Sequence, residues 1–154
     1  MTLLEAPEST AIRFYRATGD WGFLSNLYRS PVEVDGRRFP TAEHAYQFAK
    51  PIDPAVAEWI MAAPKPHLVA VAAHGLLSFD VRPDWTTFKV ERMRQVLLAK
   101  FLQHDDLALK LKRTAPLELV EESKTDAFWG IGKNGRGKNM LGTLLMEIRA
   151  ELCP

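Results

Sequence analysis

Hydrophobic residues recur with two different periods along this chain of 154 residues, and the period separates predicted strands from predicted helices. Residues 12–15, IRFY, alternate apolar and polar side chains as a half-buried strand does. The segment PVEVDGRRFP places Asp35 and Gly36 where a two-residue hairpin turn needs positive φ angles. A small antiparallel sheet is therefore predicted near the N-terminus.

From Thr41 onward the spacing becomes helical. Thr41 is a suitable N-cap for a helix that runs to Lys50, because Pro51 and Pro54 prevent its continuation. The last helix is predicted to begin at Asn139, also as an N-cap. Apolar periodicity between prolines, glycines and polar turns predicts further helices over residues 55–63, 66–77, 88–103 and 107–114.

Composition narrows the class of protein. A hydrophobic content of 47% suffices for one core, so a single domain is expected over residues 11–154, after a loose lead-in of residues 1–10. Twenty basic and 19 acidic residues leave a net charge of +1, so an anionic ligand must be held locally. One cysteine, no signal sequence and no apolar run of membrane length favour the cytoplasm.

Residues 39–50, FPTAEHAYQFAK, gather an unusual number of reactive groups. On a continuous helix Gln47 and Lys50 would each lie within roughly 40° of Glu43. Such a stripe is typical of a catalytic face, but an ordinary solvated helix face has the same composition. Spacing alone favours the solvated face.

A second candidate is the glycine-rich stretch GKNGRGKN, residues 132–139. It matches a nucleotide phosphate loop except at Asn139, where that loop has a hydroxyl. No buried strand precedes it, and no acidic strand end completes a metal site, which excludes an ATPase. Backbone N–H groups together with Lys133, Arg136 and Lys138 can still bind a phosphate. A surface turn whose basic side chains are merely solvated explains the same residues equally well.

Isolated aromatic and polar residues add weaker signals. Trp129 and Trp85 can stack on a base or sugar, although core burial is the ordinary role of tryptophan. Asn26 can supply hydrogen bonds to a ligand, and Lys100 is expected to snorkel from an apolar stripe to solvent. The four histidines lack zinc-site spacing and no serine nucleophile elbow is present, so an active site would rest on carboxylate, lysine and aromatic groups.

Taken in order, WGFLSN, PTAEHAYQFAK, KFLQH, DAFWGIG and GKNMLGTLLMEIR resemble the NADAR family, also described as YbiA-like N-glycosidases. The resemblance extends from about Phe14 to Leu152. It implies an α+β fold, that is, a mostly helical single domain with a small antiparallel sheet. It also implies an enzyme that cleaves N-glycosidic bonds to ribose. Two substrate classes are implied: phosphorylated ribosylamino intermediates of riboflavin synthesis, and ADP-ribose attached to guanine in nucleic acid.

The family motifs carry over to this chain position by position. They give Glu43, Lys50 and Asp126 as catalytic residues. The predicted substrate-binding residues are Asn26, Trp85, Trp129, Gly130, Gly132, Lys138, Asn139 and Gly142. No metal, cofactor, membrane or obligate protein partner is expected.

Two mechanisms fit these residues. Glu43 can stabilise an oxocarbenium-like ribose and activate water, with Asp126 as an orienting or second acidic group. Alternatively Lys50 can capture the ring-opened ribose as a Schiff base while Glu43 shuttles protons. A non-catalytic module that binds ADP-ribose or related nucleotides is a different class that the motifs leave open.

Overall fold

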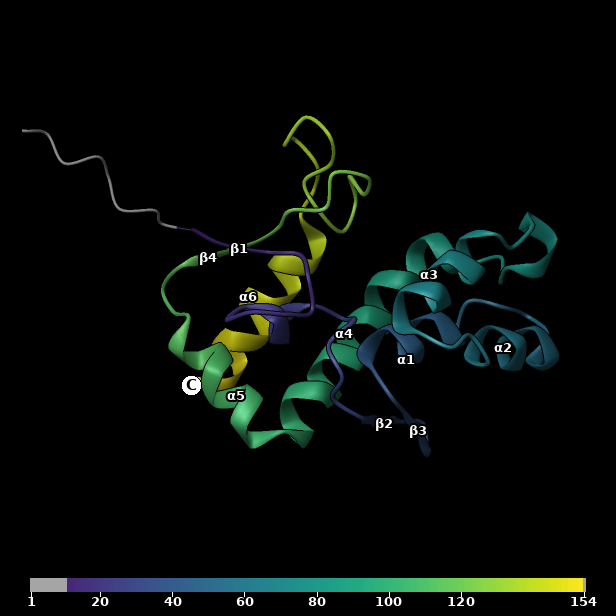
Figure 1. Cartoon of the computed structure of the whole chain (residues 1–154), viewed down its shortest axis with the longest axis horizontal. Coiled ribbons are helices and arrows are strands. Elements are labelled where there is room, and N and C mark those ends of the chain that lie inside the picture. Colours follow the sequence, from purple (N-terminus) through teal and green to yellow (C-terminus); the bar gives the residue numbers. More distant parts are fainter. Residues whose placement is uncertain (1–10, 154) are drawn as a thin grey trace, which may run out of the picture. The chain divides into compact units, whose positions relative to one another are not determined.

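A computed structural model describes residues 11–153, so the lead-in expected for residues 1–10 lies outside the described part. The strands are β1 (Ala11–Phe14), β2 (Val32–Val34), β3 (Arg37–Phe39) and β4 (Glu118–Glu121). The helices are α1 (Ala42–Phe48), α2 (Pro54–Met61), α3 (Pro66–His74), α4 (Trp85–Gln103), α5 (Asp105–Arg113) and α6 (Met140–Leu152), with short 3-10 turns η1 (Gly22–Leu24) and η2 (Ser78–Asp80) (Figure 1). The fold is α+β and mostly helical, as the sequence predicted.

The chain forms two compact units. One consists of residues 25–107 and contains the β2–β3 hairpin and helices α1 to α4. The other combines the residues up to Leu24 with those from Ala108 onward, and contains β1, β4 and α6. Within the described residues, each helix lacks the length or the apolar run needed to cross a membrane.

The predicted hairpin is present in the unit of residues 25–107. Strands β2 and β3 pair antiparallel, with Val32 opposite Phe39. Asp35 and Gly36 form the turn with φ angles of 52° and 77°, the left-handed conformation that this turn requires. The buried face of the hairpin packs against α1 and α4, and Arg92 donates to Asp35 from α4, so the hairpin is fixed to both helices.

Helix α1 begins where predicted but ends early. The Thr41 hydroxyl accepts a hydrogen bond from the backbone N–H of His44, as an N-cap does. The helix ends at Phe48, so the expected extension to Lys50 is wrong. Lys50 precedes Pro51, whose ring disfavours a helical conformation in the preceding residue.

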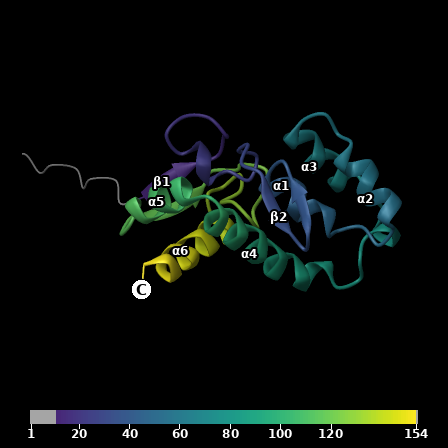
Figure 2. The ribbon, with the colours of Figure 1, turned by 90° about the horizontal axis from the view of Figure 1, so that it is seen from below.

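The segment after α1 instead pairs with residues 80–82. The Lys50 carbonyl accepts from the Arg82 N–H at 3.0 Å, and Pro51 forms a bridge with Val81. Helix α1 contacts α2, α3 and α4 as well as the hairpin (Figures 1 and 2). The polar face of α1 is therefore enclosed by its neighbours and is not a solvated surface.

In the other unit, β1 pairs in parallel with β4, Ala11 opposite Glu118 and Phe14 opposite Glu121 (Figure 1). The strand at residues 12–15 was predicted, but its partner and the parallel pairing were not. Helix α6 packs against β4 through its apolar face. The buried hydrophobic residues of these three elements are Ile12, Phe14, Leu119, Val120, Leu141, Leu144, Leu145 and Ile148.

Candidate active site

The Glu43 carboxylate lies in the first turn of α1 and is only 9% exposed. Its Oε1 atom accepts a hydrogen bond from Gln47 Nε2 at 2.8 Å. Its backbone N–H donates to the Asn26 carbonyl at 3.1 Å, which fixes the start of the helix. A buried carboxylate needs such hydrogen bonds, and the N-terminal end of a helix favours its negative charge.

The two residues that form these hydrogen bonds with Glu43, Gln47 and Asn26, each carry a buried side-chain oxygen. Gln47 is 3% exposed and Asn26 is 7% exposed. Within residues 11–153, nothing donates a hydrogen bond to Gln47 Oε1 or to Asn26 Oδ1. The Asn26 amide nitrogen lies 3.1 Å from the Met93 sulfur, which is a weak acceptor. Buried acceptors of this kind are costly, and they indicate a site where water or a ligand donates.

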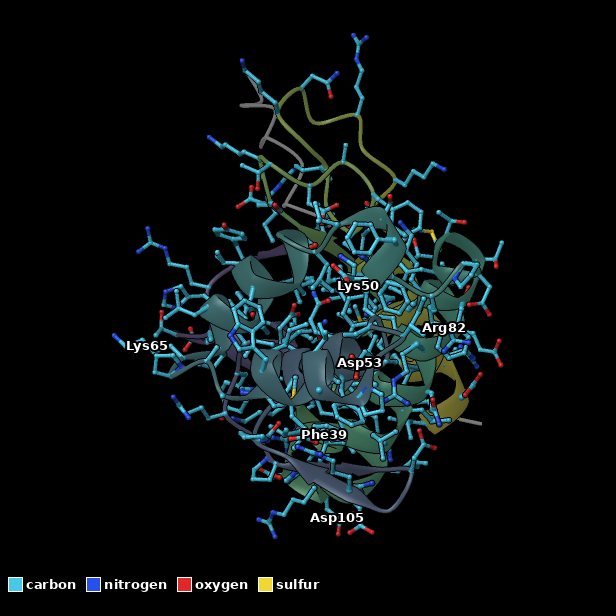
Figure 3. The ribbon with its side chains drawn as sticks, turned by 90° about the vertical axis from the view of Figure 1, so that its right-hand side faces the viewer. Phe39, Lys50, Asp53, Lys65, Arg82 and Asp105 are labelled. Carbon is cyan, nitrogen blue, oxygen red and sulfur yellow. The ribbon has the colours of Figure 1, made fainter. Side chains whose placement is uncertain are left out.

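Lys50 is half-buried, and its Nζ donates to the Ala73 carbonyl of α3 at 2.9 Å. Burial lowers the pKa of Lys50, and the nearby positive charge of Lys89 lowers it further, while the Glu43 carboxylate opposes both. Glu43 and Lys50 are thus in electrostatic reach of each other, although not through a shared helix face. In the side-chain view, Lys65 lies at the left edge, Arg82 on the right, and Lys50 between them (Figure 3).

His44 supports the start of α1. Its Nδ1 lies 2.7 Å from the Thr41 hydroxyl, which already accepts the His44 backbone N–H. The Thr41 hydroxyl thus contacts both the backbone N–H and the ring of His44. Burial lowers the pKa of His44, and the charge of Arg29 adds to this effect, which favours the neutral form.

Trp85 begins α4 and joins an aromatic group beside α1. Its ring centroid lies 5.2 Å from that of Tyr46 and 6.4 Å from that of Phe88. The Arg82 guanidinium lies 3.6 Å from the Phe88 ring centroid. Trp85 itself is half-buried, so it combines packing on α1 with an accessible part of the ring.

Lys100 contradicts the expectation that it snorkels to solvent. Its side chain is completely buried, and its Nζ donates to the Ser25 carbonyl at 3.1 Å. Burial lowers the pKa of Lys100 to about 7. The position of Lys100 beside the buried residues Leu97 and Phe101 on α4 was the signal in the sequence for burial, and the preference of lysine for solvent was given too much weight.

In the other unit, Asp126 organises a turn. Its Oδ1 accepts the backbone N–H groups of Phe128 at 2.9 Å and Trp129 at 2.8 Å. Trp129 is half-buried and its ring meets that of Phe128 edge to face, with centroids 4.9 Å apart. Asp126 therefore holds Trp129 in place, which agrees with an orienting role more closely than with that of an acid.

Local packing and backbone conformation explain why glycine occupies positions 130 and 132. A Cβ on Gly130 would lie 2.8 Å from the Ser123 Cβ, closer than real Cβ atoms approach. Gly132 has a φ angle of +69°, a conformation that other residues rarely adopt. Packing and backbone geometry account for both glycines, and ligand contact at these positions stays a prediction.

The expected backbone phosphate cradle before α6 is not available. Successive N–H groups of residues 137–141 donate to carbonyls of residues 127–131. These donors are consumed within the loop, so the N–H groups of residues 137–141 cannot form a phosphate cradle in this conformation. The side chains of Lys133, Arg136 and Lys138 are exposed, so a phosphate contact in this loop would depend on them.

Asn139 occupies the predicted N-cap position of α6, but its side chain makes no capping hydrogen bond. It adopts left-handed angles, φ 50° and ψ 43°, and its side chain turns to β4. Its Oδ1 accepts the Glu121 N–H and its Nδ2 donates to the Leu119 carbonyl, both at 2.9 Å. A Cβ on Gly142 would lie 2.1 Å from the same Leu119 carbonyl. Both residues therefore fasten α6 to the strand, while a role in substrate binding stays a prediction.

The predicted residues fall into two groups. Asn26, Glu43, Lys50 and Trp85 belong to the unit of residues 25–107, where direct contacts or electrostatic interactions connect each of them with α1. The others belong to the second unit: Asp126, Trp129, Gly130, Gly132, Lys138, Asn139 and Gly142. Sequence reasoning noticed Gln47 in the polar stripe but did not select it. Among residues 11–153, no three His, Cys, Asp or Glu side chains are grouped to hold a metal ion.

The chain is similar to several known proteins over most of its length. The N-glycosidase YbiA of Shigella flexneri is 43% identical over 145 residues, which cover 94% of this chain and 90% of that protein. A riboflavin biosynthesis protein of Vibrio vulnificus is 38% identical over 92% of this chain, although the matched region is only 38% of the longer protein. The solved NMR structure of the E. coli protein YbiA matches with a TM-score of 0.85 at 40% identity, covering 96% of this chain and 88% of that one.

The family prediction is thereby confirmed. Residues 13–153 match the family model of the NADAR domain, which covers almost the whole chain. The structural likeness to YbiA extends over both units and agrees with the α+β fold. The chain belongs to the NADAR domain family.

Proposed function

We propose that this chain hydrolyses the bond between ribose C1 and nitrogen in phosphorylated ribosyl compounds. Membership of the NADAR family and 43% identity with an N-glycosidase over most of the chain support a hydrolase acting on N-glycosyl bonds. The observation that carries the proposal is the buried Glu43 carboxylate, oriented by Gln47 and interacting electrostatically with Lys50. A module that only binds nucleotides has no need of this arrangement.

Direct hydrolysis uses the carboxylate. Glu43 stabilises positive charge as ribose approaches an oxocarbenium ion, and it takes a proton from the water that attacks C1. The electron pair of the C1–N bond passes to the nitrogen, which takes a proton and leaves. The hydrogen bond from Gln47 orients the carboxylate for this role.

A Schiff-base route uses Lys50. Its lowered pKa raises the fraction of neutral amine, which can attack C1 of the ring-opened sugar and expel the nitrogen base. Water then hydrolyses the lysine iminium and releases the sugar aldehyde. Borohydride added during turnover would reduce the iminium and leave a stable mass adduct on Lys50. Turnover without an adduct favours direct hydrolysis.

The proposed substrate is a small phosphorylated ribosylamino compound. The name of the Vibrio vulnificus relative places that protein in riboflavin biosynthesis, and the net charge of +1 offers little general attraction for nucleic acid. ADP-ribose on a guanine base is the second candidate, because a single base flipped out of a strand needs few phosphate contacts. For it, the group of Tyr46, Trp85 and Phe88 offers a surface for stacking.

The decisive experiment offers both substrates to the purified chain. A phosphorylated ribosylaminopyrimidine and DNA carrying ADP-ribosylated guanine are incubated separately, and released base and sugar are identified by mass spectrometry. The proposal expects free base and ribose 5-phosphate from the first. Release only from the DNA would select the second candidate. Tight binding of both without any released base would show a binding module and overturn the enzymatic proposal.

A further inference from the structure

The hydrogen-bonding properties of its neighbour determine the orientation of the Gln47 amide. Its nearest partner is the Glu43 carboxylate, which in its ionised form only accepts hydrogen bonds. The Gln47 NH₂ group must therefore face Glu43, as the 2.8 Å contact from Nε2 to Oε1 shows. The amide oxygen consequently points away from the carboxylate, and a flipped amide would set two acceptors against each other.

That oxygen is a buried acceptor with unused capacity. The Gln47 side chain is 3% exposed, and among residues 11–153 no donor reaches its Oε1. An unsatisfied buried carbonyl costs free energy, so the position favours a bound group that donates. Gln47 also follows Glu43 by one helical turn, a spacing that places the two side chains next to each other on α1.

We infer that the Gln47 amide recognises the 2-hydroxyl of the ribose whose C1 faces Glu43. This inference rests on the proposed function. The 2-hydroxyl oxygen is bonded to the carbon next to C1, so a sugar held with C1 at one side chain presents this donor to the neighbouring side chain. Hydrogen bonds to the 2-hydroxyl strengthen in the transition state of glycoside cleavage, which makes the contact useful for catalysis as well as for recognition.

The proposed contact of Gln47 connects recognition of the 2-hydroxyl with the Glu43 carboxylate. One amide accepts from the substrate hydroxyl through Oε1 and donates to the carboxylate through Nε2. A sugar that lacks the 2-hydroxyl leaves Oε1 buried and unsatisfied. The site is therefore specific for ribose over 2-deoxyribose, and Gln47 is the residue that makes the distinction.

The test measures binding of ribose 5-phosphate and of 2-deoxyribose 5-phosphate by calorimetry, with the wild type and with Gln47→Met. These sugars contain no glycosidic nitrogen, so a contact with a nitrogen-bound hydrogen of the substrate cannot produce the result. The wild type should bind ribose 5-phosphate roughly tenfold more tightly, the range expected for one buried hydrogen bond. Gln47→Met should bind the two sugars about equally.

Matched variants separate recognition from loss of structure. Gln95→Met makes the same change at an exposed amide of α4 and should keep the preference for ribose. Gln47→Glu keeps an acceptor but sets a second carboxylate beside Glu43, which raises the apparent pKa of the pair. Its activity should therefore rise at a higher pH than that of the wild type, which reports the proximity of position 47 to the reacting carboxylate.

The outcomes separate this inference from the proposed function. Equal binding of both sugars by the wild type, no binding of either, or a preference that Gln47→Met retains would each overturn the role of Gln47. If Gln47→Met is unfolded by its thermal melting curve, the sugar preference of Gln47→Ala decides, and a retained preference for ribose 5-phosphate overturns the role. Discrimination through Gln47 without release of base from any ribosyl substrate would instead leave recognition standing and remove the proposed hydrolysis.

Discussion

Helix α1 and the glycine loop of residues 130–139 were both candidates from the sequence, and they differ in how their polar groups are satisfied. In α1, Glu43 and Gln47 are buried, and the Gln47 oxygen accepts no hydrogen bond within the described residues. In the loop, successive backbone N–H groups are paired internally and the basic side chains are exposed. Buried hydrogen-bonding capacity that the protein leaves unused is the stronger indication of a ligand site.

The difference also separates two uses of polar residues. The Asp126 side chain accepts hydrogen bonds from backbone N–H groups and so holds a turn in place. The Asn139 side chain bonds a backbone N–H and a backbone carbonyl of β4 and so holds α6 in place. The Glu43 carboxylate accepts from the Gln47 amide, Lys50 donates to the Ala73 carbonyl, and the two charges interact electrostatically with each other. The first pair builds the scaffold, and the second pair is the one to which we assign the proposed chemistry.

The largest expected effect comes from Glu43→Gln. This change keeps the size of the side chain and removes the base, so the rate of base release should fall on the order of 100-fold to 10,000-fold. Binding of ribose 5-phosphate and the thermal melting curve should change little. Full activity in the folded variant would remove the carboxylate from the mechanism and with it the contrast between α1 and the loop.

Asn139→Gly tests the scaffold role in the other region. Glycine accepts the left-handed backbone at this position but loses both hydrogen bonds to β4. The free energy of unfolding, measured by urea denaturation, should fall by about 2 kcal/mol. The rate of base release at saturating substrate should stay close to that of the wild type. An active-site role of Asn139 would show instead as lost turnover with unchanged stability.

The exposed charges of the loop are tested by replacing Lys133, Arg136 and Lys138 together with alanine. If their side chains contact phosphate, ribose 5-phosphate should bind roughly tenfold more weakly, with ribose itself unaffected. Calorimetry with the two sugars gives this ratio directly. Equal weakening of both sugars, or of neither, would mean that the loop is a solvated turn with no phosphate contact.

The smallest expected effect is a shift in pH dependence. Lys89 lowers the pKa of Lys50, so Lys89→Met should raise that pKa and reduce the fraction of neutral amine at a given pH. If neutral Lys50 is the nucleophile, activity rises as pH increases through its pKa, and this rise should move to higher pH in the variant. An unchanged pH–rate profile would favour direct hydrolysis by water.

Local signals predicted much of the fold. The sequence correctly predicted the positive φ angles of Asp35 and Gly36 and the cap at Thr41, because these features depend on neighbouring residues. The pairing of β1 with β4 was missed because it joins segments more than 100 residues apart, beyond the reach of local periodicity. Lys50 was placed on the helix because the projection ignored the constraint that Pro51 imposes on its predecessor.

The candidate site was predictable only in part. Family motifs pointed to Glu43 and Lys50, and the structure adds their burial, their partners and the lowered pKa of Lys50. The burial of Lys100 and the unused oxygen of Gln47 depend on how elements pack, which spacing along one helix does not reveal. Unsatisfied buried atoms become visible only once the packing is known.

The most direct test of the α1 site is a structure of Glu43→Gln with an uncleaved phosphorylated ribosylaminopyrimidine bound. The account predicts ribose C1 beside the side chain at position 43, Lys50 Nζ within reach of the same carbon, and the 2-hydroxyl on Gln47 Oε1. A ribose bound away from α1, or with C1 turned from position 43, would contradict the account.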